Sequence, residues 1–179
     1  MEFLELIEDR RSVRAYKPGV GISREELEKM VYAAQQAPSW KNSQTSRYYA
    51  ILSSNKISEF RETCLPGFNY ERTDNVAAIV VSTFEGGIVG FDPNGNPTDA
   101  HGDGWGMYDA GLATQNLILC ARDLGFDTLI MGLRNEAKMR QMLGIPETQK
   151  IAAVIAVGKR VEDPAKPPRK DICELLKFF

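Results

Sequence analysis

Long apolar runs, clustered cysteines and an excess of one charge are all missing from this sequence. No stretch approaches the roughly 18 uninterrupted apolar residues of a membrane-spanning helix. The N-terminus, MEFLELIEDRR, lacks the basic start and apolar run of a signal peptide. The formal net charge is −2, with Lys and Arg spread along the chain, so the concentrated basic face of nucleic-acid-binding proteins is absent. We therefore expect neither a membrane nor nucleic acid as a partner.

Histidine and cysteine are too scarce for the common metal sites. His101 is the single histidine, and the three cysteines, Cys64, Cys120 and Cys173, are far apart. Their spacing suits neither a zinc site nor a disulfide framework. The sequence therefore predicts no metal site, and it favours a cytoplasmic location, where thiols stay reduced.

The 179 residues, 43% of them hydrophobic, suit one domain that spans residues 1–179. Periodicity and capping signals predict helices at residues 2–11, from the Ser23–Glu26 capping box to Pro38, and at 56–64, 105–124 and 135–143. Apolar runs predict strands at residues 47–53, 76–83, 126–131 and 151–157. Helices and strands do not alternate strictly, so we predict the α+β class.

Three segments have an unusual composition. Residues 84–104 contain six glycines and two prolines, and a loop of this length in a compact domain is usually functional, so we predict a substrate-access loop. The predicted helix 105–124 is apolar or small nearly all round, which favours the centre of a core or a subunit interface. The tail, 161–179, ends in an apolar cluster that would be costly to expose, so we predict that it clasps a partner subunit.

The segment RRSVR brings three guanidinium groups and a hydroxyl together at the end of the first predicted helix. Arg10, Arg11 and Arg14 offer planar, permanently charged donors that suit phosphate oxygens, and Ser12 lies between them. Taken alone, the segment is also compatible with a solvated basic helix end, which the helix dipole favours.

The segment APSWKNSQ, residues 37–44, lies between a predicted helix and a predicted strand. Asn42 and Gln44 carry amides that both donate and accept hydrogen bonds, as the edge of a heterocycle requires. Taken alone, the segment is also compatible with ordinary turn chemistry.

In this order and spacing, RRSVRAY and APSWKNSQ resemble the FMN-dependent nitroreductase family, with its R-R-S-x-R-x-[FY] and A-P-S-x-x-N-x-Q-P-W patterns. The chain departs from the second pattern at Thr45 and Ser46, where Pro and Trp are usual. Residues 108–128, YDAGLATQNLILCARDLGFDT, resemble the central helix of the family. The resemblance continues through IMGLRNEAKMRQMLGIPE, IAAVIAVGKR and PPRK and covers essentially the whole chain.

This resemblance implies a nitroreductase-like fold: a central mixed, mostly antiparallel sheet flanked by helices, in an intertwined homodimer with FMN at the interface. Pro38 and Ser39 would then contact the flavin of the other subunit. For the phosphate, Lys159 and Arg160 compete with Arg169 and Lys170. The implied cofactor-binding residues are Arg10, Arg11, Ser12, Arg14, Pro38, Ser39, Asn42, Gln44, Asn69, Arg72, Met131, Gly132, Leu133, Arg169 and Lys170.

The resemblance also implies an FMN-dependent oxidoreductase that takes hydride from NADH or NADPH and reduces small organic acceptors, such as nitroaromatics or quinones, in ping-pong fashion. No catalytic side chain is implied, since the flavin carries the chemistry; the Gly132 N–H would donate to flavin N5. No G-x-G-x-x-G motif offers a separate nicotinamide site. The alternatives are other flavin chemistry, such as fragmentation of reduced flavin or reductive dehalogenation, a flavin binder without significant turnover, and an interaction module without flavin.

Overall fold

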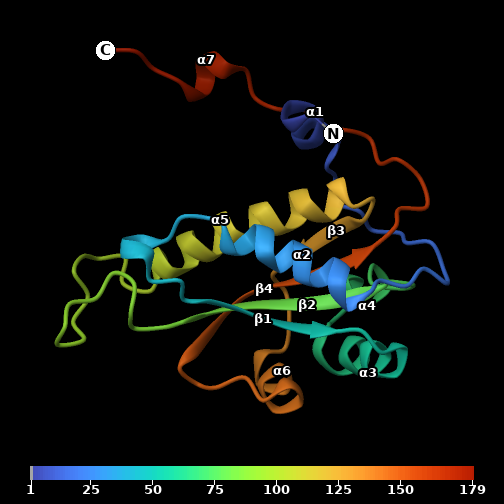
Figure 1. Ribbon diagram of the computed structural model, residues 1–179, viewed down its shortest axis with the longest axis horizontal. Coiled ribbons are helices and arrows are strands. Elements are labelled where there is room, and N and C mark those ends of the chain that lie inside the picture. The colour runs from blue at the N-terminus through green and yellow to red at the C-terminus, as the bar shows by residue number, and fades with distance from the viewer. Residues whose placement is uncertain (1) are drawn as a thin grey trace.

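A four-stranded antiparallel sheet forms the centre of the structure (Figure 1), a computed structural model that describes residues 2–179. The strand order is β1-β2-β4-β3, and every neighbouring pair is antiparallel. The strands are β1 (Ser46–Ile51), β2 (Ala78–Glu85), β3 (Asp127–Met131) and β4 (Gln149–Gly158). The α+β class and the mostly antiparallel sheet predicted from the sequence are confirmed.

The two central strands come from the most apolar runs of the sequence. Almost every residue of β2 is buried, and so is almost every residue of β4. Val81 of β2 pairs with Val154 of β4 on one side and with Tyr49 of β1 on the other. A strand that is covered on both faces needs a continuous apolar run rather than an alternating one. β1 and β3 are the two edges of the sheet.

Helices α2 (Arg24–Gln35) and α5 (Gly104–Asp123) cover one face of the sheet (Figure 1). Gly106 allows α5 to approach β2 closely, because a Cβ at this position would lie 2.5 Å from the ring of Phe84. The buried side chains of this layer include Leu27, Met30, Val80, Leu117, Ile118, Ala121 and Phe126. The opposite side of α5 leaves Met107 and Tyr108 exposed. One side of α5 therefore packs into the core, as predicted, whereas the other side exposes large apolar residues.

Helices α3 (Ser54–Cys64) and α6 (Glu136–Leu143) cover the other face (Figure 1). Gly144 ends α6 in the left-handed conformation, with φ 64°, where glycine avoids the Cβ clash. The buried side chains of this layer include Val13, Tyr16, Phe60, Cys64, Ile79, Met131 and Met139. The short elements η1 (Trp40–Asn42) and α4 (Phe68–Glu71) lie in the connections before β1 and β2.

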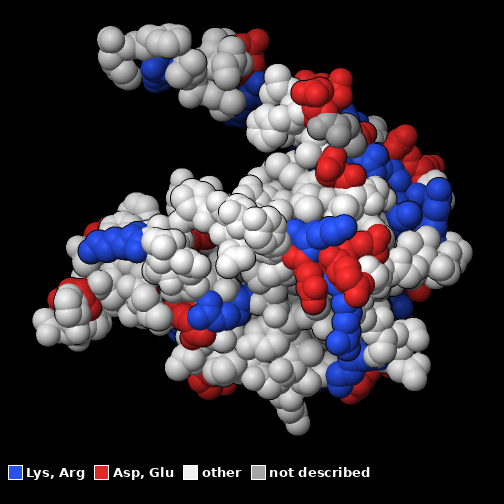
Figure 2. Space-filling model, in the orientation of Figure 1, with Lys and Arg blue, Asp and Glu red and all other residues white. Residues whose placement is uncertain are grey.

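The two ends of the chain lie outside this three-layer body. Helix α1 (Phe3–Asp9) has no buried residue, and the tail with α7 (Ile172–Leu175) runs past α1 and away from the body (Figure 1). The accessible surface is 10520 Å², whereas a compact monomer of this size exposes roughly 8,700 Å². The far end of the tail is mostly apolar, with few charged side chains (Figure 2): its exposed side chains include Leu175, Leu176, Phe178 and Phe179. No helix within residues 2–179 has the length and apolar character to cross a bilayer.

Three sequence-derived assignments need correction. Phe84 and Glu85 belong to β2 rather than to the predicted loop, because Phe84 is buried beneath α5, so the loop covers residues 86–103. The first helix ends at Asp9, since Arg10 already has extended backbone angles. Helices α4 and α7 were missed because four residues are too few to show a helical period. The other boundaries agree with the prediction within about three residues.

Candidate functional site

The arginine segment lies beside the edge strand β3. Ser12 pairs with Thr128 of β3 in a parallel bridge, and the Val13 N–H donates to the Thr128 carbonyl at 3.0 Å. Val13 is buried in the core, and extended backbone alternates side chains between faces. Ser12 and Arg14 are therefore exposed on the opposite side. Burial of Val13 therefore orients the side chains of Ser12 and Arg14 towards solvent.

The charge of Arg169 acts on Arg10 although the two residues are far apart in sequence. Partial burial, and then the positive charges of Arg169 and Arg11, lower the pKa of Arg10. Within residues 2–179, neither Arg10, Arg14 nor Arg169 forms an ion pair with a carboxylate; Arg14 and Arg169 donate only to nearby backbone carbonyls. Unpaired cations in one place repel each other, so this cluster suits an anionic ligand.

The remaining predicted cations have protein partners. Arg11 donates to the carbonyls of Glu8 and Arg10, where it caps the C-terminus of α1. Lys170 lies 3.8 Å from a carboxylate oxygen of Glu174 in the exposed tail.

The alternative phosphate pair, Lys159 and Arg160, is engaged in the fold. Arg160 forms ion pairs with Asp127 at 3.0 Å, with Asp9 at 3.2 Å and with Asp163. The Lys159 ammonium lies 5.2 Å from the ring centre of Phe126. Between the two, Arg160 is neutralised by its carboxylate partners, whereas Arg169 has no ion pair among the described residues.

A rigid turn follows β3 at Gly132. Arg134 donates to the Gly132 carbonyl at 2.7 Å and to the Ile151 carbonyl at 2.6 Å. Asn69, which is buried, donates its amide N–H to the Leu133 carbonyl at 2.8 Å. A Cβ on Gly132 would meet no atom within 4 Å, and its φ is outside the positive range. The fold itself therefore gives no reason for glycine here, and the face in front of this turn is open.

Three further predicted residues lie in or near this turn. Met131 is the buried last residue of β3, whereas Leu133 is exposed. The Arg72 guanidinium lies over the Phe68 ring at 4.5 Å from its centre and forms no ion pair within the described part of the chain. We group these residues with the arginine segment and the tail cations and call the group the first cluster: Arg10, Arg11, Ser12, Arg14, Asn69, Arg72, Met131, Gly132, Leu133, Arg169 and Lys170.

The second cluster is the loop between α2 and β1, with Pro38, Ser39, Asn42 and Gln44. The Gln44 N–H donates to the Ser39 hydroxyl at 3.1 Å, and the Gln44 amide donates to Asn42 Oδ1 at 3.2 Å. Both side-chain amides are exposed at the tip of the loop. The loop therefore presents its polar groups outward.

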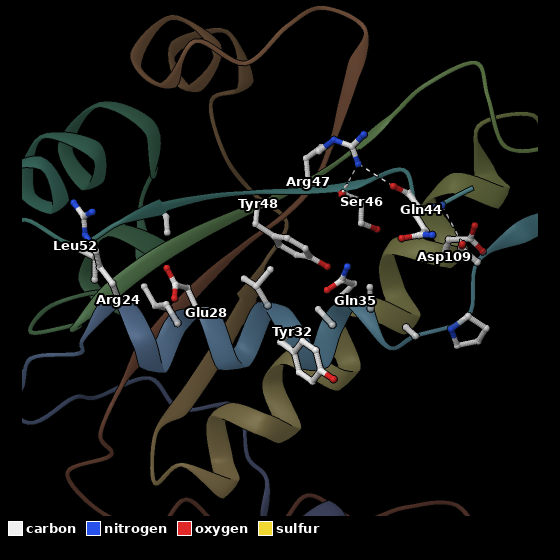
Figure 3. A pocket seen from close by; sticks show the side chains of 18 residues that line it. Arg24, Glu28, Tyr32, Gln35, Gln44, Ser46, Arg47, Tyr48, Leu52 and Asp109 are labelled. Atoms are coloured by element: carbon white, nitrogen blue, oxygen red, sulfur yellow. Dashed lines mark hydrogen bonds between the residues drawn. The ribbon is translucent and has the colours of Figure 1, made fainter. Parts of the chain in front are cut away.

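This loop forms one end of a groove of about 750 Å³ between α2 and β1 (Figure 3). Tyr48 points from β1 across the groove towards α2, whereas Arg24, Glu28 and Tyr32 line the helix side. The Tyr48 hydroxyl is buried without a hydrogen-bond partner among the described residues, and burial raises the pKa of this group. The apolar floor comes from Leu27, Val31, Ala34, Ala37, Ala50, Leu52 and Ala113.

The two clusters lie at opposite edges of the sheet. Three strand spacings of about 4.8 Å, roughly 14 Å in all, separate β1 from β3, and Ser12 lies beyond β3. The register also displaces the clusters along the strands: Thr128 aligns with Ala78, six residues before Phe84, the partner of Ser46. A single chain therefore does not bring its two clusters together around one small ligand.

Three positioning contacts had been missed from the sequence. Asp109 accepts a hydrogen bond from the Trp40 N–H, the Trp105 ring lies against the Trp40 ring, and Arg134 fixes the Gly132 turn. Asp109 is part of the D-x-G-x-A-x-Q-N pattern, which marks it as a candidate residue. The pattern does not identify its partner, Trp40, which lies 69 positions away.

Comparisons with known proteins identify the family of the chain. The model of the Nitroreductase family matches residues 7–159. A protein of Archaeoglobus fulgidus named as an NADH dehydrogenase/NAD(P)H nitroreductase is 31% identical over 161 residues, which cover 88% of this chain and 84% of that protein. The CLA biosynthesis enone reductase of Lactiplantibacillus plantarum is 26% identical, with 95% of this chain and 91% of the enzyme covered. A protein of Exiguobacterium sibiricum, solved as a nitroreductase in complex with FMN, superposes with a TM-score of 0.84 at 23% identity and covers 100% of this chain and 98% of its own.

Proposed function

Because the chain belongs to the nitroreductase family, we propose that it binds FMN and passes electrons from NADH or NADPH to a small organic acceptor. The observation that carries the proposal is the first cluster. Unpaired Arg10, Arg14 and Arg169 lie at the same edge of the sheet as the open face of Gly132. A flavin mononucleotide requires cations for its phosphate and an open face for its ring.

The residues present fit this cofactor by their chemistry. Arg10 and Arg169 would hold the phosphate with charge-assisted hydrogen bonds, and Arg11 and Lys170 would add to the positive field. Ser12 would bind the ribityl chain.

The ring would rest at the turn after β3. Met131, Gly132 and Leu133 would line one ring face. Asn69, whose side chain is buried, would support the ring by holding this turn through its hydrogen bond to the Leu133 carbonyl. The Gly132 N–H would donate to flavin N5. Arg14 and Arg72, as nearby cations, would stabilise negative charge on the pyrimidine side by Coulomb attraction.

Bound FMN supplies the two-electron redox chemistry of such an enzyme. The chain's own residues bind and orient it, and no side chain is assigned as a general acid, so the product would be protonated from solvent. Because no separate nicotinamide motif is present, donor and acceptor would use the same open face in turn. We therefore propose ping-pong kinetics.

The separation of the two clusters supports a homodimer. If Pro38, Ser39, Asn42 and Gln44 contact a flavin, they contact the flavin held by the first cluster of the partner subunit. The exposed apolar tail 161–179 and the open edge of β1 beside the groove supply surfaces for such an assembly. We propose that the tail clasps the partner.

The loop 86–103 supports an access role, because it is tied to the second cluster. Trp105 donates its indole N–H to Asp99 at 2.8 Å and lies against Trp40, with ring centres 5.2 Å apart. We propose that this loop borders the acceptor site. Nitroaromatics and quinones are the proposed acceptors. The likeness to an enone reductase adds activated alkenes as a second class.

The cellular location stays a proposal of its own. Cys64, Cys120 and Cys173 are free thiols, which suits a reducing cytoplasm.

The test starts from the purified protein. Its flavin should be identified by chromatography as FMN, and NADH or NADPH should bleach the bound flavin in an anaerobic stopped-flow experiment. A panel of quinones, nitroaromatics and enones should then reoxidise it. Recovery of FAD, or a protein that binds no flavin, would refute the phosphate-clamp argument. Bound FMN that neither nicotinamide reduces would favour a flavin binder or other flavin chemistry.

A further inference from the structure

The loop before β1 has an unusual backbone. Lys41, Asn42 and Gln44 all have positive φ angles, of 49°, 55° and 50°. Asn adopts this left-handed region readily, but Lys and Gln rarely do so. Two disfavoured residues within four positions indicate a conformation that contacts outside the loop must hold.

Helix α5 supplies the contact at the start of the loop. Asp109 accepts a hydrogen bond from the Trp40 N–H through Oδ2 at 2.9 Å, and only 6% of Asp109 is exposed. Figure 3 shows Asp109 beside Gln44 at the end of the groove. On the same helix, the Trp105 ring lies against the Trp40 ring. A buried carboxylate is costly unless it has hydrogen-bond partners, so this contact fixes the loop at Trp40.

The end of the loop is fixed from β1. The Arg47 guanidinium donates to the Gln44 carbonyl at 2.8 Å and to the Ser46 carbonyl at 2.9 Å. The loop also carries hydrogen bonds of its own, such as the one that the Gln44 N–H donates to the Ser39 hydroxyl. Loss of the Asp109 anchor would leave the Trp40 N–H without its partner and the strained residues free to relax.

We propose that Asp109 is a positioning residue for the flavin site of the partner subunit. It holds the loop in the strained conformation that presents Ser39 and its neighbours across the twofold axis. The inference rests on the proposed function, because it assumes that this loop contacts the partner's FMN. In this role Asp109 acts through the Trp40 N–H, to which its carboxylate is bonded.

Asp109→Ala and Asp109→Asn test this role. Asparagine keeps an oxygen acceptor for the Trp40 N–H, whereas alanine removes it. FMN affinity of the flavin-stripped dimer should fall about tenfold to a hundredfold for Asp109→Ala, the range for a lost hydrogen bond to a charged group. Asp109→Asn should stay within roughly threefold of the wild type. The visible circular dichroism of bound FMN should change in the alanine variant only.

A matched control is Ser23→Ala, which removes another side-chain acceptor of a backbone N–H in the same helical layer, at 3.1 Å. It should lower thermal stability and leave FMN affinity unchanged. Near-ultraviolet circular dichroism of the flavin-free protein reports the Trp40–Trp105 pair directly, and it should change in Asp109→Ala.

The outcomes separate the two hypotheses. Wild-type affinity and flavin dichroism in Asp109→Ala would overturn the positioning role while the proposed function stands. Dissociation of the alanine variant into monomers would also overturn it, since Asp109 would then act on assembly. If the wild type binds no FMN, the proposed function fails and the flavin role of Asp109 fails with it, whatever the tryptophan signal shows.

Discussion

Arg160 binds Asp127 through two separate contacts. Its Nε donates to Oδ1 at 3.0 Å, and its backbone N–H donates to Oδ2 at 3.0 Å. Asp127 is almost fully buried at the start of β3, and Arg122 pairs with the same carboxylate at 3.2 Å. Arg160 is therefore a structural cation that ties the chain leaving β4 to the edge strand beneath the arginine segment.

This pairing predicts opposite phenotypes for two arginines. Arg160→Ala should destabilise the fold by about 3 kcal/mol, because it removes one partner from a buried ion pair. Arg169→Ala should leave stability nearly unchanged, since it has no ion pair in the described chain, and should weaken FMN binding by about 1.5–3 kcal/mol. Thermal melts and FMN titrations of both variants check this. If Arg169→Ala binds FMN normally while Arg10→Ala binds it more weakly, Arg169 is not a phosphate ligand, and the N-terminal arginine segment alone binds the phosphate.

Gly132 offers a test of the ring face. Gly132→Ala should fold with nearly wild-type stability, because its Cβ would meet no atom of the chain within 4 Å. FMN affinity, or reduction of bound FMN by NADH, should fall, since the methyl group would occupy the proposed ring face. Gly106→Ala is the contrasting control: its Cβ would lie 2.5 Å from Phe84, so the melting temperature should drop. Unchanged flavin binding and reduction in Gly132→Ala would remove this turn from the site.

Asp9 makes the stability of the fold sensitive to acid. Burial acts to raise its pKa, but the hydrogen bond and charge of Arg122, with help from Arg160, hold the pKa below its ordinary value. A carboxylate with a depressed pKa contributes stability above its unfolded-state pKa, and this is lost as the pH falls through the folded-state value. Asp9→Asn should therefore be less stable than the wild type near neutral pH, and the difference should shrink below about pH 4. Thermal melts across this range measure it; a difference that persists at about pH 2 would contradict the assignment.

Much of the fold follows from local sequence signals. The runs that became β2 and β4 are continuous because both faces are covered, and Ser23 caps α2 in the predicted capping box. The contact between Asp109 and Trp40 was not predictable, because nothing local links residues 69 positions apart.

The candidate site was predictable only in part. Its residue types follow from the motifs, but their division between two edges of the sheet depends on the strand order. The roles of Arg160 and Arg169 could not be separated in the sequence either, since both are arginines near prolines and acids. They differ in the folded structure, where Asp127 lies beside Arg160 and forms an ion pair with it.

The tail provides the test of the dimer. Its exposed apolar side chains lie far from the body of the chain, and such a surface is normally covered by a partner. An obligate dimer should bury well over roughly 2,000 Å². Deletion of residues 175–179 should therefore shift the sedimentation equilibrium towards monomer and lower FMN occupancy in parallel, because each complete site needs the second cluster of the partner. Lys177→Ala, within the same segment but without loss of apolar surface, should behave as the wild type. A full-length chain that sediments as a stable monomer at micromolar concentration and still holds FMN would contradict both the dimer and the division of the site between two subunits.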